Sequence, residues 1–201
     1  MLQGSGNERR PAADDQSRAI ARLIVLLNDP DQAKRRQARL GLMALGQAAM
    51  PSILNTLKFG PENSRWQVAK ALSQLADPST APALVQALRD HSFGVRWLAA
   101  EGLTAMSCDG LEPLLAGLIC DADSVWLREG AHHVLHSMHD NGLAETECAV
   151  AEDVLCALEG PAPASELPWK AEAALEKLRQ AHGQPAELPE NPCDCAEGDA
   201  S

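Results

Sequence analysis

The chain has 201 residues, of which 45% are hydrophobic, and a formal net charge of -11 at pH 7. Residues 1–70 contain 11 Lys and Arg against 6 Asp and Glu (+5), whereas residues 71–201 contain 6 against 22 (-16). An acidic body of this kind argues against a protein that binds nucleic acid along its phosphates. The first residues lack an apolar signal region and no run of about 18 apolar residues occurs, so we expect a soluble cytoplasmic protein with no membrane partner.

The N-terminal part predicts a short lead followed by helices. Residues 1–13 are polar and contain glycine and proline, which predicts a flexible lead. A helix is predicted over residues 14–28, because apolar residues recur there at intervals of three and four. A second helix is predicted from Asp31 until Gly46 stops it, and a third begins near Pro51.

The middle of the chain repeats itself about every 31 residues. A shift of 31 places Arg65, Trp66 and Leu72 on Arg96, Trp97 and Leu103, and a further shift of 32 reaches Arg128 and Leu135. The prolines Pro51, Pro82 and Pro113 keep the same spacing, and proline is tolerated in a first helical turn. Each unit is therefore predicted to be a helix, a tight turn and a second helix. Ser64, Ser92 and Ser124 are predicted to cap the first helices, and Ser79 or Thr80 the helix that contains Pro82.

The pattern weakens towards the C-terminus. A helix is predicted near residues 144–158, followed by a Pro-rich linker near 160–168 and a closing half-repeat over 169–180. The repeat region is thus predicted to span residues 14–182. Residues 183–201 are polar, acidic and rich in proline and glycine, which predicts a disordered tail.

The segments DHSFGVRWLAAEGL and DADSVWLREGAHHVL resemble the HEAT repeat, most closely the short bacterial type also found in phycobilisome-lyase subunits. The resemblance implies an all-α, right-handed α-solenoid of helical hairpins, with first helices on the convex side and second helices on the concave side. It also implies a ladder between turns that pairs Asp29 with Arg35, Asp90 with Arg96 and Asp121 with Arg128. Phe59 takes the Asp place before Arg65, so an interruption is expected there.

The outward positions of the second helices are the candidate partner-binding residues. With Leu84 and Leu88 facing the core, three rows are predicted to point outwards: Ser52, Ala83 and Leu114; Asn55, Gln86 and Gly117; and Thr56, Ala87 and Leu118. Leu114 and Leu118 could form an exposed apolar spot for a partner, unless a shifted helix or the acidic tail covers them. Lys58 and Arg89 occupy equivalent positions and would add cations beside this groove.

Three other groups suggest chemistry but have simpler interpretations. Trp66, Trp97 and Trp169 share one register and are predicted to fill seams between units in preference to forming a ligand platform. His132, His136 and His139 share a helix face at a spacing compatible with a metal, although a pH-sensitive structural cluster is the favoured interpretation. Cys193 and Cys195 form half a metal or redox site at most.

The sequence therefore favours a non-catalytic scaffold, adaptor or assembly factor that grips another protein in its concave groove through Asn55, Lys58, Gln86, Arg89, Leu114 and Leu118. It predicts no cofactor and no nucleic-acid partner. The alternative is a cofactor- or metal-handling subunit resembling the bilin-lyase proteins, with its site at the histidine and cysteine end. The fold alone does not decide between them, because this scaffold serves many tasks.

Overall fold

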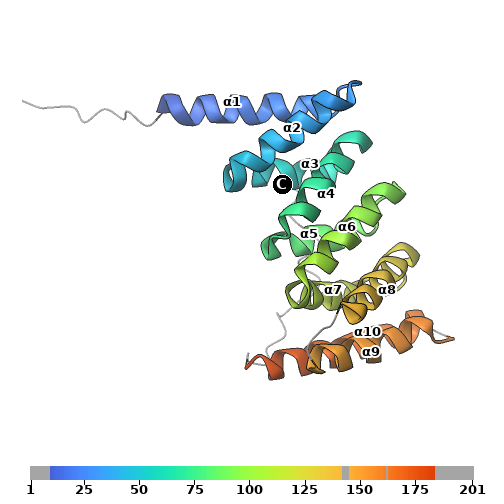
Figure 1. Ribbon diagram of the computed structural model, residues 1–201. Coiled ribbons are helices and arrows are strands. Elements are labelled where there is room, and N and C mark those ends of the chain that lie inside the picture. Colours follow the sequence, from blue (N-terminus) through green and yellow to red (C-terminus); the bar gives the residue numbers. More distant parts are fainter. Residues whose placement is uncertain (1–9, 142–144, 162, 184–201) are drawn as a thin grey trace, which may run out of the picture. The chain divides into compact units, whose positions relative to one another are not determined.

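A computed structural model describes residues 10–141, 145–161 and 163–183 of the chain (Figure 1). These residues form ten α-helices and two short 3-10 helices and contain no strand, which confirms the all-α prediction. The helices are α1 (Arg10–Leu26), α2 (Gln32–Leu45), η1 (Gly46–Ala48), α3 (Met50–Phe59), α4 (Glu62–Leu75), η2 (Pro78–Thr80), α5 (Ala81–Ala87), α6 (Phe93–Met106), α7 (Cys108–Cys120), α8 (Val125–Asp140), α9 (Glu145–Glu159) and α10 (Pro163–Ala181). Most of the predicted N-terminal lead and C-terminal tail lies outside the described residues.

The chain divides into two compact units, residues 1–71 and 72–201, with the boundary inside α4. In the first unit, α1 packs on α2 and α3, and Ile20 of α1 and Leu27 just after it are buried. In the second unit, α6 packs on α8, and α5 packs on α6 and α7. The last helix, α10, packs on both α9 and α7, so it continues the row of second helices beside α7.

The tight turns that join first and second helices share an unusual backbone conformation. Gly46, Ala76 and Ser107 have positive φ angles of 55°, 47° and 52°. They lie 30 and 31 residues apart and thus occupy the same place in successive units. Only glycine adopts this conformation without steric cost, and Gly46 ends α2 as predicted.

The arginine ladder is present, but its acceptors are backbone carbonyls. Arg35 Nη1 donates to Asp29 O at 2.7 Å, and Arg96 Nη1 donates to Asp90 O at 2.8 Å. Arg128 donates to Ala122 O, so the predicted pairing with Asp121 is wrong by one residue. Arg65 Nη1 still donates to Gly60 O at 2.9 Å, so the expected interruption at Phe59 does not occur. The ladder continues because a carbonyl acceptor needs no particular side chain.

Several helix ends differ from the predictions. Ser64 is buried inside α4, which begins at Glu62, so it is not a cap. Ser124 accepts a hydrogen bond from Leu127 N, but Ser92 caps α6 without a side-chain bond. Thr80 donates to Asp77 O and does not cap α5 with its side chain. A shift of one or two residues at a helix end is enough to move a hydroxyl out of the capping position.

Two helices near the C-terminus begin earlier than predicted. α7 begins at Cys108, so Pro113 lies inside the helix and not in its first turn. α10 begins at Pro163, so the linker predicted over residues 160–168 is shorter. Pro163 stands at the start of a helix, where proline is tolerated, while Pro168 lies within α10.

Candidate functional site

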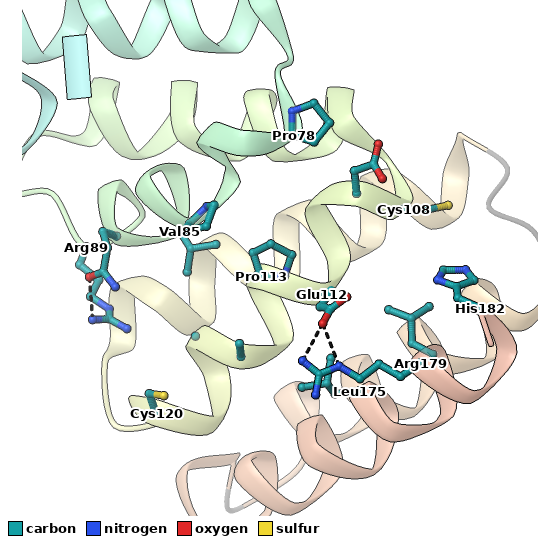
Figure 2. A pocket seen from close by; sticks show the side chains of 16 residues that line it. Pro78, Val85, Arg89, Cys108, Glu112, Pro113, Cys120, Leu175, Arg179 and His182 are labelled. Carbon is teal, nitrogen blue, oxygen red and sulfur yellow. Dashed lines mark hydrogen bonds and ion pairs between the residues drawn. The ribbon is translucent and has the colours of Figure 1, made fainter. Parts of the chain in front are cut away.

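A groove of about 370 Å³ opens between α5, α7 and α10 in the second unit (Figure 2). Its lining is mostly apolar and includes Pro78, Pro82, Val85, Pro113, Ala116, Gly117, Leu175 and Leu178. A Cβ added to Gly117 would lie 2.5 Å from Val85 Cγ1, so glycine keeps this wall open where α5 and α7 approach. Pockets of this size suit a small ligand or a few side chains of a partner.

Two arginines of the groove are fixed by carboxylates. Arg179 of α10 donates from Nε and Nη2 to Glu112 Oε1 at 2.8 and 2.6 Å, which ties α10 to α7. Arg89, after α5, donates from Nη1 to Gln86 Oε1 at 3.2 Å, and its Nε lies 3.2 Å from Asp121 Oδ2. Figure 2 shows Glu112 directed towards Arg179 and a dashed contact at Arg89. Each arginine side chain lies beside a carboxylate, so these two ion pairs add no net charge to the groove.

The structure places the predicted partner-binding residues in different environments. Gln86 and Arg89 line the groove between α5, α7 and α10. Asn55 and Lys58 are exposed on α3, which belongs to the other unit. Leu114 and Leu118 are fully buried, so the predicted exposed apolar spot does not exist.

The error at Leu114 and Leu118 has a physical reason. The row formed by Thr56, Ala87 and Leu118 is buried in all three second helices, so it belongs to the core and not to the surface. In α7 the apolar residues Leu111, Leu114, Leu115 and Leu118 are all buried. α7 contacts α5, α6, α8 and α10, which leaves only a narrow face open.

Most residues of the groove were not identified from the sequence. Cys108, Asp109, Glu112 and Cys120 come from α7, and Leu175, Leu178, Arg179 and His182 come from the end of α10. These residues lie together because α7 packs on α10. Helical periodicity describes one helix at a time and does not predict contacts between distant segments. The prolines Pro82 and Pro113 were a usable signal, since both line the groove at a spacing of 31.

The predicted seam-filling tryptophans are partly or largely exposed. Trp66, Trp97 and Trp169 are 37%, 46% and 74% exposed, so none is enclosed between helix pairs, although the centroid of the Trp97 ring lies 4.7 Å from that of the His133 ring of α8. Trp97 instead belongs to an exposed aromatic cluster on α6 and α8. The cluster consists of His91, Phe93, Arg96, Trp97, Trp126 and His133, with the Arg96 guanidinium over the rings of Phe93 and Trp126.

His132, His136 and His139 of α8 contact carboxylates of α8 and α9, and His136 and His139 share Asp140. His132 Nε2 lies 3.0 Å from Glu159 Oε1, and His139 Nε2 lies 3.3 Å from Glu152 Oε1, so both join α8 to α9. His136 Nδ1 lies 3.1 Å from Asp140 Oδ2 on its own helix. Among the described residues, no group of three or more His, Cys, Asp or Glu side chains is arranged to hold a metal ion. The side chains of Cys148, Cys193 and Cys195 lie outside the described residues.

The sequence comparison agrees with this architecture. The family model for HEAT repeats matches residues 20–104 and 50–136, which together cover more than half of the chain. The chain therefore belongs to the HEAT-repeat family. A search of curated proteins found no match. Within the described residues, no helix is long and apolar enough to cross a membrane.

Proposed function

We propose that the chain is a non-catalytic adaptor or assembly factor that holds an apolar segment of another protein in the groove between α5, α7 and α10. HEAT repeats commonly serve as protein-interaction scaffolds. The observation that carries the proposal is a preformed groove with apolar walls whose two arginines are already held by Glu112 and Asp121. A partner side chain that enters it buries apolar surface without having to neutralise either arginine.

The prolines give the groove a rigid rim. Pro78 and Pro82 are exposed, and Pro113 is half-buried. Proline loses little conformational entropy when a ligand covers it, so contacts at this rim favour binding. Gln86 supplies polar atoms beside the rim and orients the partner by hydrogen bonding.

The groove is tested by photo-cross-linking in the native source. A photoreactive amino acid replaces Ala116, which lines the groove, and in a matched control it replaces Ala105, an exposed residue of α6. The proposal expects a cross-linked partner protein from position 116 and not from 105. In a competition assay, the unlabelled chain should reduce cross-linking from position 116. Unlabelled Ala116→Arg should not reduce it, although its helical circular dichroism should be unchanged. Equal capture from both positions contradicts the proposal.

The alternative is a cofactor- or metal-handling subunit at the histidines of α8. It would require His132, His136 and His139 to exchange their contacts with Glu159, Asp140 and Glu152 for one ligand. Metal analysis of the purified protein with and without His136→Ala decides it. Stoichiometric metal that this change removes would favour the alternative, and no bound metal would oppose it.

A further inference from the structure

The outer surface of α2 carries an open hollow with a cationic edge. Its lining consists of Gln32, Ala33, Arg36, Gln37 and Leu40. Leu40, which lines the hollow, is 48% exposed. Of the four Lys and Arg residues of α2, Lys34 pairs with Asp29 at 3.3 Å and Arg39 is buried, so Arg36 is the cation that lines the hollow. The hollow therefore offers an apolar contact beside a guanidinium.

The last helix carries a surface of the opposite kind. Trp169 of α10 is 74% exposed, the highest value, shared with Val25, among the large exposed hydrophobic side chains of the described residues. Glu166 and Ala173 lie one turn before and one turn after it, and Glu172 and Glu176 follow on the same helix. Lys170 is the neighbouring cation, while Lys177 is held by Asp153 at 2.7 Å. Trp169 is thus an exposed apolar side chain whose neighbours on α10 are mainly acidic.

The charges of the two units are complementary. The first unit, residues 1–71, contains 11 Lys and Arg against 6 Asp and Glu, which gives +5. The second unit, residues 72–201, contains 6 against 22, which gives -16. Between two molecules, a contact of the first unit with the second is attractive, whereas contacts of like units are repulsive. Electrostatics therefore favours contacts between the first unit of one copy and the second unit of another.

We propose that the occupant of the α2 hollow is Trp169 from a second copy of this chain. The indole would cover Leu40 and stack against the Arg36 guanidinium, a pairing that contributes beyond the buried area. Glu166 would then face the cations of α2. One such contact leaves one α2 surface and one α10 surface unused, and these either pair with each other in a closed two-fold dimer or bind further copies. None of these residues lines the groove between α5, α7 and α10, so this proposal is independent of the proposed function.

The first test is the mass of the full chain in solution as a function of protein concentration. A monomer has a mass of 21.4 kDa. Light scattering at low ionic strength should show an average mass that rises with concentration to at least twice this value. Salt should lower it, since the charges are exposed and screened within about 10 Å at 0.1 M ionic strength. A mass that stays at the monomer value at every concentration overturns the proposal, and it also shows that the opposite charges do not act between copies.

The second test uses two complementary variants. Trp169→Ser removes the α10 surface and leaves the α2 hollow, whereas Leu40→Asp spoils the hollow and leaves Trp169. Each variant alone should remain monomeric, and their equimolar mixture should form a dimer and nothing larger. Both side chains are exposed, so neither change opens a core, and unchanged circular dichroism verifies this.

The matched control is Phe93→Ser, which removes a comparably exposed aromatic residue, 68% exposed, from α6. It should associate like the unmodified chain. A mixture of the two variants that stays monomeric contradicts the proposal, as does self-association of either variant at the level of the unmodified chain. Arg36→Glu gives an independent variant that should weaken association without removing apolar surface.

Discussion

At the scale of single residues, the turn positions show how one backbone conformation is repeated with different side chains. Gly46 and Ser107 have nearly the same angles, with φ 55° and ψ -131° in one and φ 52° and ψ -125° in the other. Glycine populates this region freely, whereas a Cβ there crowds the neighbouring carbonyl. Ser107 therefore holds strain that the packing of α6 and α7 compensates.

Replacement of Ser107 by glycine should relieve this strain. We expect Ser107→Gly to raise the free energy of unfolding by about 0.5–1 kcal/mol, after subtraction of the greater freedom of glycine in the unfolded chain. Gly46→Ala is the reverse change at the equivalent position and should lower it by a similar amount. Urea titrations followed by circular dichroism measure both, and a destabilised Ser107→Gly variant would contradict the assignment of strain.

Leu114 shows what burial implies for a residue that sequence reasoning placed on the surface. Its side chain is fully buried, so Leu114→Ala should lower the free energy of unfolding by about 2–5 kcal/mol through lost transfer energy and a cavity. Leu75, which is 37% exposed at the end of α4, is the matched control, and Leu75→Ala should cost well under half as much. Equal losses in a urea titration would show that Leu114 is not part of a packed core.

At the scale of helices, local patterns predicted the elements well and their contacts poorly. The three-and-four spacing and the 31-residue repeat located α2, α3 and α6 because both signals come from residues within one helix or one unit. The groove depends on Arg179 meeting Glu112 across 67 residues, which no local pattern encodes. Leu118 was misplaced for the same reason, since its exposure is decided by the helices that pack around α7.

The docking of α10 on α9 includes an exposed ion pair that should respond to acid. The Lys177 ammonium, hydrogen-bonded to Asp153, lowers the pKa of that carboxyl, and burial opposes this only in part. A lowered pKa in the folded state contributes stability above the pKa of the unfolded state, and this contribution disappears as the pH falls through the folded value. Both side chains are about half exposed, so we expect no more than about 0.5 kcal/mol.

The measurement is a comparison of Lys177→Met with the unmodified chain by urea denaturation at several pH values. The variant should be slightly less stable at neutral pH, and the difference should vanish as the pH falls through the lowered pKa of Asp153, because protonation of the carboxyl removes the ion pair. Asp153→Asn should remove the same contribution and make the Lys177 change neutral. A difference that grows on acidification would contradict this account.

At the scale of the whole molecule, stability is distributed by neighbour contacts. Each helix of a repeat array packs chiefly on those beside it, so interior helices have more partners than terminal ones. α7 contacts α5, α6, α8 and α10, whereas α1 packs mainly on α2 and α3. α1 also leaves most of its surface in solvent, including Val25, which is 74% exposed.

This difference predicts a graded pattern of amide hydrogen exchange. Amides of α6 and α7 should exchange slowest, because their opening requires the loss of several packed neighbours, and those of α1 should exchange fastest among the long helices through local opening. Leu135→Ala in α8 should accelerate exchange in α6 and α8, which pack together, more than in α1. Mass spectrometry of peptic fragments resolves these helices. Uniform acceleration along the chain would show that the units unfold as one cooperative body and that neighbour contacts do not limit the spread of the perturbation.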